Sequence, residues 1–277
     1  MAIDLVFLII VLIYLILASV YDIKTREVPD FLSYSLLAIA LFFALSKSIY
    51  FHTFSFIIQS LFGILIFIIL SFFLYYTRQW GGGDAKLLIA LGASFPVYPG
   101  FLLNYFSPNL SMPFLIIFLI NLAVFGSLYS VLYAIIIVAR QKNSLKSFNK
   151  KYLIFLYFSL ALFLISFSLQ KTFSLLLIAT ALVILYPFLF HFIKIFEKNF
   201  MFKTLPLSKI TEGDWLSENI YKNKKLILSK NSPGLTLKDI KKLKALKIKQ
   251  VKIKYGMPFI PSFLIAFIIS LIFGSLI

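Results

Sequence analysis

Long runs of apolar residues alternate with short polar segments along most of this chain. A helix that crosses a membrane needs roughly 20 consecutive apolar residues, and runs of that length are too long for a strand. The pattern therefore predicts an all-α polytopic membrane protein with about eight transmembrane helices. The predicted spans are residues 3–22, 31–47, 54–76, 84–103, 114–139, 152–169, 172–193 and 259–277.

The fourth of these runs, residues 84–103, is the weakest. Pro96 and Pro99 interrupt it, so its helix is expected to kink or to stop at Phe95. A helix that covered only residues 85–95 would be too short to span a bilayer. The distribution of basic residues decides whether this run crosses.

Basic residues gather on one side of the membrane if all eight runs cross. With the N-terminus outside, all of the 27 Lys and Arg except Lys47 and Lys171 lie on the cytoplasmic side. A re-entrant fourth run would move the basic segments 140–151 and 194–258 outside, against the positive-inside rule. We therefore predict a multi-pass protein of the cell membrane. Most of its net charge of +17 then reflects topology and attraction to anionic lipid, and no nucleic-acid partner is expected.

Residues 197–257 differ from the rest in composition, with 15 Lys and five acidic residues. Thr236 and Asp239 are spaced as in a capping box, and residues 237, 240 and 243 repeat as on a short amphipathic helix: Leu237, Ile240 and Leu243. Apolar residues then alternate with lysines over residues 251–255, as in a half-buried strand. This predicts a small α+β cytoplasmic domain before the last helix. It contains no catalytic set, and its lysines are expected to contact anionic lipid headgroups.

Two aspartates stand at predicted ends of membrane helices. Asp22 ends the first run and Asp84 begins the fourth, and the two runs between them lead the chain out and back. Both carboxylates should therefore lie at the same cytoplasmic depth. Two carboxyl groups placed close together cannot both ionise cheaply, so one can activate a water molecule while the other donates a proton. The pair predicts aspartyl protease chemistry with Asp22 and Asp84 as catalytic residues.

Three glycines precede Asp84: Gly81, Gly82 and Gly83. Without Cβ atoms they would let the backbone of an extended substrate approach the carboxylate. Each aspartate alone also fits a plain structural role, Asp84 as a helix N-cap and Asp22 as an interfacial residue balanced by Lys24 and Arg26. The pair at matched depth favours catalysis over these roles.

The protein has no cysteine, and its two histidines, His52 and His191, are far apart in the sequence. Disulfides and thiolate sites are therefore excluded, and we expect neither a metal nor a cofactor. Four regions result. They are residues 1–103 with both aspartates, 104–196 with further transmembrane helices, 197–257 as the basic domain and 258–277 as the C-terminal transmembrane helix.

The segments YDIKTREVPD at residues 21–30 and GGGDAKLLIALGA at residues 81–93 resemble the type IV prepilin peptidases. In that family an aspartate at the inner end of the first span precedes a basic loop that ends in Ile/Val-Pro-Asn/Asp. A second motif, G-x-G-D-x-K-L, opens a later helix. The matching residues are Asp22, Val28, Pro29, Asp30, Gly81, Gly83, Asp84, Lys86 and Leu87. The missing cysteines and the lysine-rich segment before the last span resemble the archaeal branch, which includes the preflagellin (archaellin) peptidases.

The resemblance implies a GxGD aspartyl endopeptidase, a hydrolase that processes signal peptides at the cytoplasmic membrane face of an archaeal cell. Its substrates would be prepilins or preflagellins, with a short basic class III leader before a hydrophobic helix that builds a type IV pilus or archaellum. The cysteine-bearing loop of bacterial relatives is absent, so no methyltransferase activity is expected. Two other classes stay open: a presenilin-like intramembrane aspartyl protease, and an ion-coupled transporter, which would place its carboxylates nearer the midplane.

Overall fold

The computed structural model describes residues 2–77, 79–140, 149–168, 171–222, 225–232 and 234–276. These residues are mostly helical, with a small sheet region near the C-terminus. The chain divides into two compact units. One comprises Met1–Val131 together with Thr204–Ile277, and the other comprises Leu132–Lys203.

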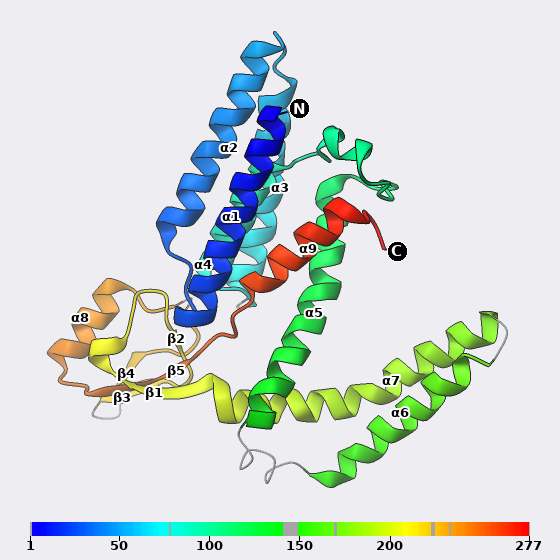
Figure 1. Cartoon of the computed structure of the whole chain (residues 1–277). Coiled ribbons are helices and arrows are strands. Elements are labelled where there is room, and N and C mark those ends of the chain that lie inside the picture. The colour runs from blue at the N-terminus through cyan, green and yellow to red at the C-terminus, as the bar shows by residue number, and fades with distance from the viewer. Residues whose placement is uncertain are drawn as a thin grey trace. The chain divides into compact units, whose positions relative to one another are not determined.

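Three long helices begin the first unit, and they lie side by side in a bundle (Figure 1). They are α1 (Ala2–Thr25), α2 (Asp30–Tyr50) and α3 (Ser55–Tyr76). Near the start of α1, the Asp4 carboxylate pairs with the Lys47 ammonium in the last turn of α2 at 2.7 Å. This ion pair places the start of α1 and the end of α2 at one level, so the two helices are antiparallel.

The fourth predicted span is broken, as its prolines indicated. Helix α4 (Gly82–Ser94) ends at Phe95, which has φ −134° and ψ 69° because the following Pro96 disfavours helical backbone. The chain then reaches a short 3₁₀ helix, η1 (Gly100–Asn104). The expected stop at Phe95 is confirmed, and α4 alone extends about 20 Å, less than the roughly 30 Å of a bilayer core.

Helix α4 packs tightly between α2 and α3, and nearly every residue after Asp84 is buried. A Cβ added at Gly92 would lie 2.6 Å from the carbonyl oxygen of Gly63 in α3, so the two backbones touch. At the C-terminal end of α4, the Ser60 hydroxyl of α3 donates to the Ala93 carbonyl at 2.8 Å. Non-helical backbone at membrane depth is tolerated where protein covers it, and here α3 supplies that cover.

Five described helices are long and apolar enough to cross a membrane, which supports a multi-pass membrane protein. They are Ile3–Thr25, Asp30–Tyr50, Ser55–Tyr76, Phe114–Arg140 and Phe173–Met201. The other three predicted spans contain shorter helices: α4, α6 (Leu153–Ser166) and α9 (Ile260–Ile272). Each predicted run therefore holds a helix, but within the described residues only five helices have the length of a span by themselves.

The second unit is a helical hairpin in which α6 packs along α7 (Lys171–Phe196), as Figure 1 shows. The Ser159 hydroxyl donates to the Ala181 carbonyl at 2.8 Å, which ties the two helices together. A π-type turn, η4 (Glu197–Met201), follows α7 and occupies the first residues of the region predicted as the basic domain. Helix α5 (Phe114–Arg140) leads into this unit, and residues 141–148 of the basic segment 140–151 lie outside the described residues.

The predicted α+β character of the basic domain is confirmed. A sheet of strand order β1-β5-β2 lies beside a β3-β4 hairpin and helix α8. The strands are β1 (Phe202–Pro206), β2 (Trp215–Leu216), β3 (Ile220–Lys222), β4 (Lys225–Leu228) and β5 (Gln250–Lys254), and α8 is Leu237–Ala245. Strands β2 and β5 are antiparallel, with Leu216 opposite Ile253.

The capping box predicted at the start of α8 is present. The Thr236 hydroxyl accepts the Asp239 N–H at 3.2 Å, and the Asp239 carboxylate accepts the Thr236 N–H at 3.0 Å. Ile240 and Leu243 are buried in the domain core, as the spacing predicted. The expectation for Leu237 was wrong, because this first residue of α8 is 58% exposed and does not join the domain core.

Candidate active site

Asp22 lies in the last turns of α1 and is buried, with 4% of its surface exposed. Unpaired carbonyl groups at a helix C-terminus disfavour a carboxylate, so another group must compensate. The Ile260 N–H supplies that compensation and donates to Asp22 Oδ2 at 2.8 Å. Ile260 is the first residue of α9, where N–H groups have no partner within the helix and the dipole is positive.

Asp84 lies in the first turn of α4, where a negative charge is favourable. Its Oδ2 accepts the N–H of Gly81 at 3.0 Å, and its side chain is only partly buried. Gly81, rather than Asp84, occupies the N-cap position of this helix. Asp84 nevertheless caps the helix from the N3 position, through the N–H of Gly81, so the plain structural role considered for it is present beside its proximity to Asp22.

The fold brings Asp22 and Asp84 near each other although 61 residues separate them in the sequence. The Asp22 carboxylate lies close enough to act electrostatically on the Asp84 carboxylate. Each carboxylate is also held by a backbone N–H at the start of a helix, which fixes its orientation. Two such carboxyl groups can share a proton, which is the arrangement that acid–base chemistry on a peptide bond requires.

Gly83 contacts the loop that carries the first motif. A Cβ at this position would lie 3.1 Å from the Cβ of Val28 and 3.3 Å from its backbone nitrogen. The sequence suggested that the glycines admit a substrate backbone, but at Gly83 the chain's own Val28 fills that space. A Cβ at Gly82 would meet only the Tyr75 ring, at 3.9 Å, and one at Gly81 would meet only the Asp84 carboxylate, at 3.4 Å.

A second contact joins the same two motifs. The Lys86 ammonium in α4 pairs with the Asp30 carboxylate at 2.6 Å and lies 5.4 Å from the centre of the Tyr34 ring. Pro29 stands at the N-cap position of α2 and directs the chain from Val28 into the helix that carries Asp30. Ion pairs this exposed contribute little stability, so the pair mainly sets the register between α2 and α4.

Helix α9 contributes residues that the sequence did not single out. The Trp80 ring, just before the glycines, lies 5.6 Å from the Phe259 ring and 5.3 Å from the Phe263 ring. Helix α9 therefore touches both the loop before Asp84 and the carboxylate of Asp22. The sequence predicted this region only as the C-terminal transmembrane helix, because no local pattern reveals a partner 238 positions away.

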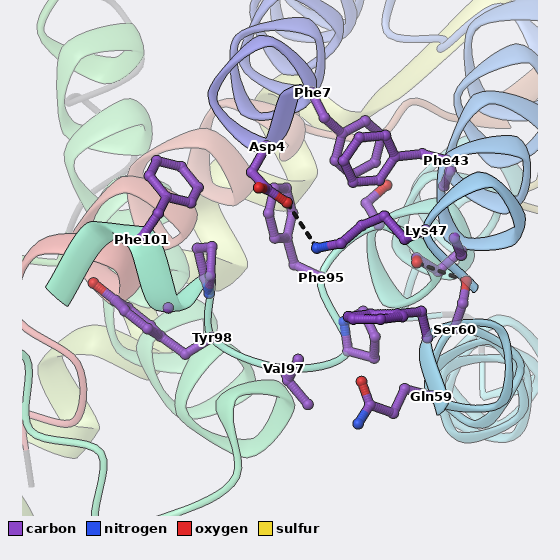
Figure 2. A pocket seen from close by; sticks show the side chains of 18 residues that line it. Asp4, Phe7, Phe43, Lys47, Gln59, Ser60, Phe95, Val97, Tyr98 and Phe101 are labelled. Carbon is purple, nitrogen blue, oxygen red and sulfur yellow. Dashed lines mark hydrogen bonds and ion pairs between the residues drawn. The ribbon is translucent and has the colours of Figure 1, made fainter. Parts of the chain in front are cut away.

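A cavity among the described residues lies elsewhere, at the opposite end of α1 (Figure 2). It measures about 230 Å³, and the Asp4–Lys47 ion pair lies beside the aromatic rings of Phe43 and Phe95 in its wall. Asp4 and Asp22 are about 27 Å apart along α1 at a rise of about 1.5 Å per residue. This cavity is therefore not part of the aspartate site.

The described part of the chain contains no group of three or more His, Cys, Asp or Glu side chains placed to hold a metal ion.

Comparison with known proteins agrees with this site. A sequence model of the type IV leader peptidase family matches residues 9–139, which include both aspartates. A preflagellin peptidase of Methanocaldococcus jannaschii is 36% identical over 98 residues, which are 33% of this chain and 42% of that protein. A preflagellin peptidase of Methanococcus maripaludis is 38% identical over 84 residues, which are 30% of this chain and 36% of that protein.

The matched stretch thus spans less than half the length of these curated relatives. No solved structure matches the chain at a significant level. The similarity to the family therefore concerns the N-terminal half of the chain.

Proposed function

Residues 9–139 match the type IV leader peptidase family, and from that similarity we propose that the protein is a membrane aspartyl endopeptidase. It cleaves the short basic leader from preflagellins or prepilins at the cytoplasmic face of the membrane. The names of the two archaeal relatives support a preflagellin as substrate. Such a substrate carries its leader directly before a hydrophobic helix, so the cleaved bond lies where the membrane begins.

The observation that carries this proposal is the pairing of Asp22 with Asp84. In the proposed reaction, the ionised carboxylate takes a proton from water as the water attacks the scissile carbonyl. The protonated carboxyl group then donates its proton to the leaving amine. Gly81 and Gly82 leave room for the extended substrate. A Cβ added at Gly81 would contact only the Asp84 carboxylate, and one added at Gly82 would contact only the Tyr75 ring.

The proposal is tested by incubating membranes that contain the protein with a preflagellin and measuring the mass of its N-terminus. We expect a loss equal to the leader peptide. An uncut N-terminus with every archaeal preflagellin and prepilin tested would contradict the proposed activity.

The finer topology is also a proposal: eight crossings with the N-terminus outside and the aspartates at the cytoplasmic face. The broken segment α4–η1 is then one of these crossings. One observation supports a crossing at this segment. Phe95 and Tyr98, in the loop after α4, line the same cavity as Asp4 and Lys47. The start of α4 is held near Asp22 instead, at the other end of α1.

Cysteine labelling should confirm this topology. The protein has no cysteine, so an introduced one is its single thiol. In intact cells a membrane-impermeant maleimide is expected to label Ser107→Cys, in the exposed loop before α5, and to leave Lys241→Cys in α8 unlabelled. Permeabilised cells should label both. Labelling of Lys241→Cys in intact cells would contradict the proposed orientation.

We further propose that the basic domain, residues 197–257, contacts anionic lipid headgroups. Three exposed lysines support a contact with lipid. Lys241 and Lys244 lie on α8, and Lys249 lies in the loop that follows it. Each lysine near an anionic surface contributes about 1 kcal/mol, and salt weakens this attraction.

Changing these three lysines to glutamate should therefore remove most of the stabilisation that anionic lipid gives to the full-length protein. The measurement is the midpoint of thermal unfolding in nanodiscs of anionic and of zwitterionic lipid, at low and high salt. Leader cleavage should stay within a few-fold of wild type. An unchanged difference between the two lipids would contradict the lipid contact, and a complete loss of cleavage would assign these lysines to the reaction.

A further inference from the structure

Arg26 holds an unusual position beside the proposed active site. It follows the last turn of α1 with φ 62°, a left-handed conformation that costs a residue other than glycine roughly 1 kcal/mol or more. Its guanidinium donates a hydrogen bond to the Gly256 carbonyl at 2.5 Å and lies 5.6 Å from the centre of the Tyr255 ring. The conformation of Arg26 is therefore fixed by contacts with the segment that follows β5.

That segment leads directly to Asp22. Gly256 is held by Arg26, and four positions later the Ile260 N–H donates to Asp22 Oδ2 at 2.8 Å. Arg26 and Asp22 are themselves one helical turn apart, with the Arg26 N–H donating to the Asp22 carbonyl at 2.9 Å. Residues 256 and 260 are thus hydrogen-bonded to two residues one turn apart at the end of α1, Arg26 and Asp22.

The far end of α9 is fastened as well. The Asn121 amide of α5 donates to the Ser270 hydroxyl and to the Gly274 carbonyl, each at 2.9 Å. The Tyr98 hydroxyl donates to the Leu271 carbonyl at 2.8 Å. With the far end of α9 held in this way, the linker that Arg26 holds and the packing of Trp80 on Phe259 and Phe263 set the position of its first N–H.

A neighbouring contact docks the basic domain on the same loop. The Thr211 hydroxyl donates to the Glu27 carboxylate at 2.9 Å. Burial raises the pKa of Asp214, which accepts the Thr211 N–H at 2.8 Å, and the nearby charge of Glu27 adds to this rise. The domain therefore meets the α1–α2 loop at two successive residues, Arg26 and Glu27, just after the proposed catalytic Asp22.

We propose that Arg26 is a positioning residue of the active site. Its contacts with Tyr255 and Gly256 keep the Ile260 N–H hydrogen-bonded to Asp22 and so orient the Asp22 carboxylate. This inference rests on the proposed peptidase function. It extends the active site to residues 255–260, which lie outside the stretch that matches the family. The basic domain then affects the reaction through its linker to α9.

The plain alternative is that Arg26 only adds to the positive charge on the cytoplasmic side. Lys24 provides a matched control, because it is an exposed basic residue of the same helix end. If charge alone counts, Arg26→Met and Lys24→Met will behave alike. If Arg26 positions Asp22, only Arg26→Met will slow the chemical step.

The test compares Arg26→Met, Arg26→Lys and Lys24→Met in the full-length protein, with kcat and KM measured for leader cleavage. Small misplacements of a catalytic group cost up to about 100-fold, so Arg26→Met should lower kcat by about ten- to 100-fold with KM within about twofold. Arg26→Lys should recover part of this loss, since lysine can donate to the Gly256 carbonyl but lacks the planar guanidinium. Lys24→Met should keep kcat within about twofold of wild type, as expected for a change of surface charge alone.

A second measurement does not depend on activity. Pro258 is buried between the two fastened ends, and Pro258→Cys would be the single thiol of the protein. Arg26→Met should speed the reaction of this thiol with a maleimide several-fold, whereas Lys24→Met should not. Should Arg26→Met fail to fold, Tyr255→Leu, which removes the ring beneath the guanidinium, should change kcat and labelling in the same direction.

The two proposals fail in different ways. Absence of cleavage by the wild-type protein would overturn the peptidase function, and the labelling rate would still decide the role of Arg26. Equal kcat values for Arg26→Met and Lys24→Met, a rise in KM alone, or an unchanged labelling rate would each overturn the positioning role.

Discussion

Replacing Asp22 or Asp84 by asparagine is expected to abolish leader cleavage while the protein still folds and inserts into the membrane. Asparagine keeps the size of the side chain and an oxygen that can accept the N–H of Ile260 or of Gly81. It cannot ionise or carry the proton that the reaction transfers. Loss of a general acid or base typically costs about 100- to 10,000-fold in rate, so each single variant should fall at or below the detection limit.

Asp4→Asn is the matched control, because it makes the same chemical change in the same helix, about 27 Å from Asp22. It breaks only the ion pair with Lys47 beside the cavity, and cleavage should stay within a few-fold of wild type. The readout is the mass of the preflagellin N-terminus after incubation with membranes that contain equal amounts of each variant. Substantial processing by Asp22→Asn or Asp84→Asn would remove that residue from the catalytic pair.

Much of the membrane fold could be predicted because its main requirement is local. A run of apolar residues such as 54–76 must form a helix to satisfy its own backbone in lipid, and the structure has α3 there. The stop at Phe95 was equally local, since Pro96 restricts the residue before it. Leu237 shows the limit of periodicity, because the capping box set where α8 begins and left its first residue outside the core.

The site was only partly within reach of the sequence. Counting spans placed Asp22 and Asp84 at one depth, since that argument needs only the order of the helices. The contacts of Asp22 with Ile260, and of Arg26 with Gly256, join positions more than 200 residues apart. Such contacts depend on how α9 packs, and neither periodicity nor a motif records that packing.

The contact between Gly83 and Val28 leads to the second large expected effect. Gly83→Val should lower the rate of cleavage more than tenfold, although it adds an apolar side chain to an apolar protein. Its Cβ would lie 3.1 Å from the Val28 Cβ, and its two methyl groups would need further space in the same direction. Overpacking of this kind costs about 1–3 kcal/mol, and the strain falls between the residue next to Asp84 and the loop that follows Asp22.

Gly82→Ala is the control for a loss of backbone freedom alone, since its Cβ would meet only the Tyr75 ring at 3.9 Å. Gly82, like Gly83, is helical, so alanine there should leave cleavage within a few-fold of wild type. The decisive variant combines Gly83→Ala with Val28→Gly, which removes the Cβ that the new methyl group would strike. If the clash is the cause, the double variant should be more active than Gly83→Ala alone, a coupling expected of residues in direct contact. Wild-type cleavage by Gly83→Val would show that the two motifs can separate without harm to the aspartate pair. Gly83 would then have no role beyond forming the first turn of α4.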